Sequence, residues 1–208
     1  MEMIATAIQL ITLMVAFSII ESWWPAAREH KWWRRPLLVD ICSWLVHPLS
    51  VSAGIALAVA FNDWILLKPF GLSPTATELR RSVAAIPFCV QILIAVVIVD
   101  FIWYWLHRAY HHFSVLWAFH LIHHSSEKLD WLSTSRLHPL GQTLDHAAIT
   151  IVLLLLGFPV SVVVASNVVI GAGAVVTHAN VPWNFGLLRH ILVSPVFHQW
   201  HHARTDDA

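Results

Sequence analysis

Long apolar stretches separated by short polar segments dominate the chain. A membrane-spanning helix needs about 20 mostly apolar residues, and three stretches suit it: residues 3–20, 37–67 and 83–106. A fourth, residues 147–176, is interrupted by Gly157-Phe158-Pro159, which breaks a helix strongly. With its flank from residue 142, it gives two legs of about 16 residues, each about 25 Å long. The pattern predicts an all-α, polytopic membrane helical bundle of about three spans plus a helical hairpin.

Composition supports a membrane protein. The chain has 208 residues, of which 58% are hydrophobic and 12% charged, whereas a soluble domain has about 25% charged residues. A formal net charge of zero gives no indication of nucleic-acid binding. Without a polar linker, we expect a single membrane domain over 1–208, with N-terminal spans in 1–99 and a histidine-rich region in 100–208. Two distant cysteines exclude a disulfide framework and an iron–sulfur cluster.

The N-terminal segment is interpreted as a retained helix. It has Glu2 in place of a basic region and no small-residue cleavage site, so it makes a poor signal peptide. The following loop carries four basic residues that should be cytoplasmic by the positive-inside rule, namely Arg28, Lys31, Arg34 and Arg35. Tryptophans bracket this loop as an interfacial belt would, at Trp23, Trp24, Trp32 and Trp33. This orientation brings the third span to the cytoplasmic face near His107.

Histidine is concentrated in the second half of the chain, where 13 of the 15 histidines fall between His107 and His202. They form three clusters with helical spacing: His107 and His111; His120, His123 and His124; and His198, His201 and His202. Residues three and four apart share one helix face, so each cluster can direct several imidazoles at one place. Ser194-Pro195 predicts a helix start just before the third cluster. Three such clusters indicate a metal site on the cytoplasmic face.

Two single histidines, His138 and His178, are further candidate ligands. Eight to ten imidazoles exceed the three or four ligands of a typical zinc site, and they suit two ions with open positions. Imidazole accepts zinc, copper, iron or nickel, so ligand type alone does not name the metal. Metal-binding histidines usually contact carboxylates. Asp100 is the best candidate because it shares a helix stripe with Tyr104 and His107, while Asp145 and Glu127 are weaker candidates.

These motifs resemble the fatty acid hydroxylase superfamily, which includes sterol desaturases, lipid hydroxylases and alkylglycerol monooxygenases. The resemblance covers about half the chain and rests on five segments: Asp100 to His111, Leu116 to Ser125, Arg136-Leu-His138-Pro139, His178-Ala-Asn180, and Ser194-Pro195 through His202. Family members usually continue beyond the third cluster, whereas this chain stops at residue 208. A chain truncated at its C-terminus is one interpretation of this difference.

The resemblance implies a membrane-bound non-haem di-iron oxidoreductase, with residues 100–208 as its catalytic region. It would use O2 to hydroxylate or desaturate a lipid, sterol or other apolar substrate; ether cleavage is not separated from these by the sequence. Zinc could occupy the same ligands. With no haem-attachment or iron–sulfur motif, a separate ferredoxin- or cytochrome-type reductase system would supply electrons. We expect an integral protein of a bacterial inner membrane.

Two other classes of function remain open. Histidines and intramembrane acids also line the ion pathways of transition-metal transporters. However, the histidines here are expected at one membrane face, whereas a transport pathway needs polar groups along its depth. A histidine-based structural, metal-binding or pH-sensing protein is the other alternative.

Overall fold

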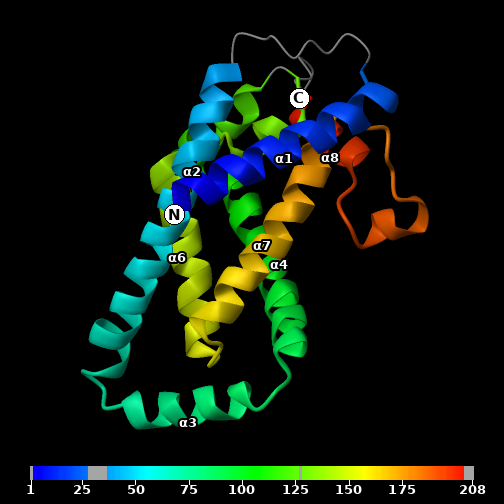
Figure 1. Cartoon of the computed structure of the whole chain (residues 1–208). Helices are drawn as coiled ribbons and strands as arrows, with labels where there is room; N and C mark the ends of the chain where they lie inside the picture. Colours follow the sequence, from blue (N-terminus) through cyan, green and yellow to red (C-terminus); the bar gives the residue numbers. More distant parts are fainter. Residues whose placement is uncertain (1, 28–36, 127, 204–208) are drawn as a thin grey trace. The chain divides into compact units, whose positions relative to one another are not determined.

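A computed structural model of the chain describes residues 2–27, 37–126 and 128–203 (Figure 1). These residues form helices and connecting segments, with no strand among them. The helices are α1 Glu2–Trp23, α2 Leu37–Phe61, the π-helix η1 Asn62–Leu67, α3 Ser73–Ala84, α4 Phe88–His112, α5 Ser114–His120, the 3₁₀ turns η2 His123–Ser125 and η3 Trp131–Ser135, α6 Pro139–Leu155, α7 Val160–His178, the 3₁₀ turn η4 Gly186–His190 and α8 Pro195–His202. The all-α class is therefore confirmed.

Three helices in the described part of the chain are long and apolar enough to cross a membrane. They are Leu37–Leu67, Phe88–His112 and Val160–His178. The first coincides with the span predicted at residues 37–67, the second overlaps the span predicted at 83–106 but begins five residues later, and the third is the second leg of the predicted hairpin. The span predicted at residues 3–20 is not among these three and stays a prediction. α6 is apolar but shorter, as is the segment Ile11–Trp23 within α1.

Several residues used in the sequence-based orientation lie outside the described residues, namely Arg28, Lys31, Trp32, Trp33, Arg34 and Arg35, together with Glu127.

The chain forms two compact units, each assembled from distant segments. Unit 1 contains residues 1–48, 119–138 and 173–208, and unit 2 contains residues 49–118 and 139–172. Because the chain passes between the units several times, neither is a separate stretch of sequence. The prediction of one domain over residues 1–208 stays a prediction.

Unit 2 has an apolar core built from α3, α4, α6 and α7. Its fully buried side chains include Val99, Ile149, Leu153 and Val162. α6 and α7 run in opposite directions (Figure 1), as the hairpin prediction required.

The reversal between α6 and α7 is a glycine-terminated helix end. Gly157 has φ +87°, and the N–H groups of Gly157 and Phe158 bond to the carbonyls of Leu154 (3.1 Å) and Leu153 (3.0 Å). Paired bonds of this kind close a helix through a left-handed residue, which glycine adopts without a Cβ clash.

Unit 1 is organised around Trp131, whose side chain is fully buried. Its ring stacks on Phe17 of α1, with ring centroids 6.0 Å apart, and lies 5.9 Å from the ring of Trp44 in α2. The indole N–H of Trp44 donates to the Leu132 carbonyl at 2.9 Å. Both N-terminal helices therefore hold the turn η3.

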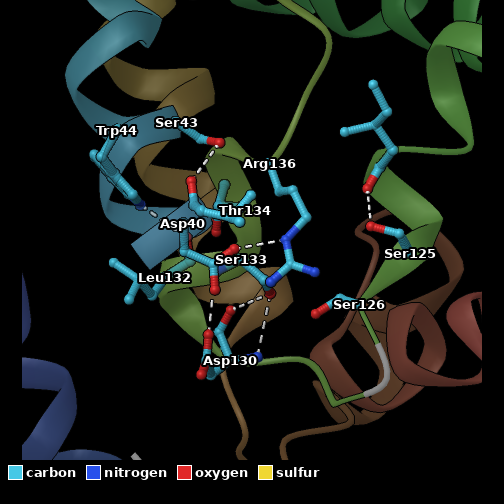
Figure 2. A network of polar contacts seen from close by, with 12 residues as sticks. Asp40, Ser43, Trp44, Ser125, Ser126, Asp130, Leu132, Ser133, Thr134 and Arg136 are labelled. Carbon is cyan, nitrogen blue, oxygen red and sulfur yellow. Dashed lines mark hydrogen bonds and ion pairs between the residues drawn. The ribbon is translucent and has the colours of Figure 1, made fainter. Parts of the chain in front are cut away.

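A buried polar network fixes the same turn (Figure 2). Asp130 caps η3 by accepting from the Ser133 N–H at 3.0 Å, and Ser133 completes a capping box. Arg136 donates from Nε to Asp40 Oδ1 at 2.6 Å, and both side chains are buried. Such pairing is what permits two charged groups to lie in an apolar interior.

Candidate metal centre

Three separate segments of unit 1 bring seven histidines together. His120 ends α5 and is followed by His123 and His124 in η2, His178 ends α7, and His198, His201 and His202 lie on α8. The start of α8 is as predicted, because Pro195 is its first residue and the Ser194 hydroxyl accepts from the Phe197 N–H at 3.3 Å.

The second cluster differs from its expected form. α5 stops at His120, so His123 and His124 occupy a 3₁₀ turn and do not continue an α-helix. Their rings nevertheless converge, with the His120 centroid 5.1 Å from His123 and 4.8 Å from His124. The tighter turn therefore keeps all three imidazoles in one place.

Four histidines make the first compact group of nitrogen atoms. His178 Nε2 lies 3.1 Å from His123 Nε2 and 2.9 Å from His198 Nε2, and His198 Nε2 lies 3.1 Å from His202 Nε2. Candidate ligand atoms of all four lie within 4.8 Å of one another. Metal–nitrogen bonds of about 2.1 Å place neighbouring ligand nitrogens about 3.0 to 3.4 Å apart around one ion. The donor set therefore fits a transition metal in both chemistry and spacing.

The orientation of His178 is set by its own helix. Its Nδ1 lies 2.7 Å from the Ala174 carbonyl oxygen, which only accepts hydrogen bonds. Nδ1 therefore carries the proton, and the neutral ring directs the lone pair of Nε2 at His123 and His198. Metal-binding histidines are commonly oriented by such a bond from the second ring nitrogen.

A second group lies beside the first and consists of His124, His201 and His202. The rings of His124 and His202 stack with centroids 4.2 Å apart, and His124 lies 4.8 Å from His201. Unit 1 thus places two groups of candidate ligands next to each other, sharing His202.

Burial keeps this cluster neutral. It lowers the pKa of His123 well below the ordinary value of 6.5, and the surrounding histidines lower it further. Burial, with smaller contributions from neighbours led by His124, lowers the pKa of His202 to about 2. Neutral imidazole is the form that binds a metal, so these side chains are ready to bind at neutral pH.

His107 and His111 lie in unit 2, on the last two turns of α4. Their ring centroids are 4.7 Å apart, and the His111 ring lies 5.1 Å from Trp117. The neighbouring Tyr110 donates its hydroxyl to Asp145 Oδ1 of α6 at 2.7 Å, and both side chains are buried. That His107 and His111 join the seven histidines of unit 1 stays a prediction.

The remaining candidates, His138, Asp100 and Tyr104, are not members of these groups. His138 is half-buried and packs edge-on against Phe119, with centroids 4.9 Å apart. The Asp100 side chain is exposed, and the exposed Tyr104 accepts a hydrogen bond from Arg108 Nη1 at 3.1 Å. Their assignment to the site stays a prediction.

Sequence reasoning missed several buried carboxyl groups, among them Glu21 of α1 and Asp40 of α2. Glu21 accepts hydrogen bonds from the backbone N–H groups of Trp131 and Asn180, and Asp40 pairs with Arg136. All three partners lie in the segments that follow the histidines of η2 and α7. The signal was present, because an acidic residue in an apolar stretch has a functional or structural reason.

Comparison with known proteins gives consistent matches. The sequence model of the fatty acid hydroxylase family matches residues 92–208, more than half of the chain. The chain is also similar to ornithine lipid hydroxylase OlsE of Rhizobium tropici, with 35% identity over 119 residues. That match covers 57% of this chain but 36% of the relative, so it spans little more than a third of the relative's length. No solved structure matches the chain significantly.

Proposed function

The chain belongs to the fatty acid hydroxylase family, and on this premise we propose that it carries the metal centre of an O2-dependent hydroxylase or desaturase of membrane lipids. The observation that carries the proposal is the convergence of seven histidines from three segments of unit 1. The relative named as an ornithine lipid hydroxylase makes amino-acid-containing membrane lipids the first substrate class to test.

We assign two iron ions to the centre. The first would bind in the group of His123, His178, His198 and His202, and the second beside His124 and His201. His120 is close to both groups of rings, and we propose that His107, His111 and His138 complete the ligand set. When bound, the iron would supply the redox chemistry that oxidises an unactivated C–H bond with O2.

The protein's own part is to bind, orient and exclude water. Burial holds His123 and His202 neutral, and the bond from His178 Nδ1 to Ala174 fixes one ring nitrogen as a ligand. The apolar spans would admit a lipid chain from the bilayer. We place the site at the cytoplasmic face of a bacterial inner membrane, on the basis of the basic loop at residues 28–35.

The proposed reaction needs an external reductant. Hydroxylation converts a C–H bond, O2, two electrons and two protons into a C–OH bond and water. Desaturation uses the same oxidant and electrons but removes two hydrogens from adjacent carbons and releases two waters. We propose that a separate ferredoxin- or cytochrome-type reductase system supplies these electrons.

The test is product analysis with labelled oxygen. The full chain, loaded with iron, would be incubated with a lipid extract containing ornithine lipids, a reductase system and ¹⁸O2. We expect either a hydroxylated lipid carrying one ¹⁸O atom or a lipid lacking two hydrogens. His201→Ala should abolish the product, whereas a change at the exposed His190, His190→Ala, should not.

Zinc provides a second control because it cannot change oxidation state. Equal activity of the zinc and iron forms would indicate hydrolysis and refute the redox proposal. Absence of both labelled and desaturated lipid with the iron form would also refute it.

A further inference from the structure

We infer that Glu21 is a positioning residue for the metal centre, and that it acts by joining the segments that carry the histidines. Glu21 lies on α1, well outside the matched residues 92–208. The inference rests on the proposed metal-binding function and concerns how the protein builds that site.

The carboxyl group of Glu21 joins two distant parts of unit 1. The side chain is 4% exposed, and its Oε1 accepts hydrogen bonds from the backbone N–H of Asn180 at 2.9 Å and of Trp131 at 3.3 Å. These donors are 159 and 110 residues away in the sequence. A single oxygen atom therefore sets the distance between the segment after α7 and the start of η3.

The Asn180 segment leads directly to two histidine clusters. Asn180 is two residues after His178. The adjacent Ala179 carbonyl accepts a hydrogen bond from Gln199 Nε2 of α8 at 3.3 Å, and Gln199 lies between His198 and His201. Holding the backbone at Asn180 therefore holds both the end of α7 and α8.

A second set of bonds fastens Asn180 to the segment that directly follows α1. The Ala27 N–H donates to Asn180 Oδ1 at 2.9 Å, and Asn180 Nδ2 donates to the Ala27 carbonyl at 3.1 Å. The Ala26 N–H also donates to the Asn180 carbonyl at 3.1 Å. α1 and the residues after it are thus attached to the chain beside His178 by several hydrogen bonds. Among these attachments, the buried Glu21 carboxyl group also bonds to η3.

The η3 segment leads to the remaining cluster. Trp131 follows His124 by seven residues, and η2 and η3 lie in contact. The bonds to Glu21 therefore connect α1 to η2, α7 and α8, which carry six of the seven histidines; the seventh, His120, ends α5 just before η2. Metal affinity depends on how closely ligands are held in their binding geometry. Loss of the carboxyl group should loosen their mutual placement without removing a ligand.

The test is metal binding by the full chain with Co²⁺ as the probe, because its absorption spectrum reports ligand geometry. Metal-free protein would be titrated against a competing chelator. Residues that orient metal ligands typically alter affinity 10–100-fold, so Glu21→Ala should weaken Co²⁺ binding about 10-fold or more and change the spectrum. Glu21→Gln keeps an oxygen acceptor and should weaken binding less than about 10-fold. The control Glu78→Ala removes an exposed glutamate of unit 2 and should change neither.

Hydrogen exchange of the metal-free protein measures the bonds themselves. In Glu21→Ala, exchange should accelerate in peptides containing Trp131 and Asn180 but not in peptides from α4. If Glu21→Ala does not fold, Glu21→Asp carries the test, because it withdraws the carboxyl group by one methylene. Weaker Co²⁺ binding by this variant supports the inference, and unchanged binding overturns it.

The outcomes separate this inference from the proposed function. Wild-type protein that binds no metal refutes both. Wild-type protein that binds Co²⁺, together with a folded Glu21→Ala variant of equal affinity and spectrum, overturns the positioning role alone. Lower thermal stability of that variant with unchanged Co²⁺ affinity would also overturn it, because Glu21 would then be purely structural.

Discussion

Arg136 and Asp40 form a buried ion pair across 96 residues of sequence, with Nε 2.6 Å from Oδ1 and side chains 4% and 0% exposed. Removing one partner leaves a charge unpaired in the interior, which lowers the free energy of unfolding by about 3–5 kcal/mol. Asp40→Ala should therefore strongly destabilise the protein in a denaturation experiment.

A second ion pair provides the matched control for Asp40. Asp63 lies 3.7 Å from Arg80, and both side chains are about 40% exposed. Exposed pairs contribute about 0–1 kcal/mol, so Asp63→Ala should have a small effect. Equal destabilisation by the two substitutions would contradict the importance of the buried pair.

Metal content is expected to depend on the clustered histidines. We expect about two transition-metal ions per chain, and His123→Ala and His201→Ala should each reduce the bound metal. His190→Ala should not, because His190 is exposed on η4. Elemental analysis of the purified variants measures this. Equal metal in all three variants would exclude the assigned ligands.

Acidification should both destabilise the protein and release its metal. The pKa of His123 is well below 6.5, and that of His202 is lowered to about 2, in each case chiefly by burial. Below about pH 6.5 the unfolded chain therefore binds protons that the folded protein does not, so stability is present above that pH and falls as pH decreases. Ligating imidazoles must also be neutral, so metal is lost in the same direction.

Thermal melting and metal analysis across a pH series check this expectation. The melting temperature of the metal-free protein should fall between about pH 7 and pH 5. A melting temperature that rises on acidification would contradict the burial of neutral histidines.

Gly157 should be intolerant of substitution. Its φ is +87°, and an added Cβ would lie 2.8 Å from Leu79 Cγ and 3.1 Å from Val83 Cγ2. Gly157→Ala should lower the free energy of unfolding by about 1–3 kcal/mol, through backbone strain and overpacking. Gly171→Ala is the control, because nothing lies within 4 Å of its Cβ position and alanine favours a helix. Denaturation curves that rank the two variants the other way would contradict the structure of this turn.

Topology can be tested by cysteine accessibility. The proposed site requires His111 and His178 on the same membrane face, so His112→Cys and the exposed Leu187→Cys should be labelled from one side. The exposed Phe70 lies in the connection between α2 and α4, which leads to the Phe88 end of α4. Because a spanning α4 separates its Phe88 end from its His112 end, Phe70→Cys should be labelled from the other side. Cys42 and Cys89 are free and exposed and would first be replaced. Labelling of His112→Cys and Leu187→Cys from opposite faces would rule out convergence of the clusters.

Local sequence patterns were sufficient to predict the helical class, the histidine spacing, the span at residues 37–67 and, to within about six residues, the span of α4. Span positions follow from local composition, because about 20 apolar residues form a helix wherever lipid surrounds them. The start of α8 was likewise predictable, since Ser194-Pro195 is a local signal. The family followed from the same local motifs, because the three histidine boxes and their neighbours lie within short segments.

Which distant residues meet depends on how the helices pack, and the structure was needed to show it. Helical spacing relates residues up to four apart, whereas His178 approaches His123 across 55 residues and Glu21 reaches Asn180 across 159. It also decided that α5 ends at His120, because the rings of His123 and His124 converge from a 3₁₀ turn that the spacing does not distinguish from an α-helix. The burial of Asp40 against Arg136 depends likewise on the packing of α2 with η3, a long-range relationship for which no local pattern carries information.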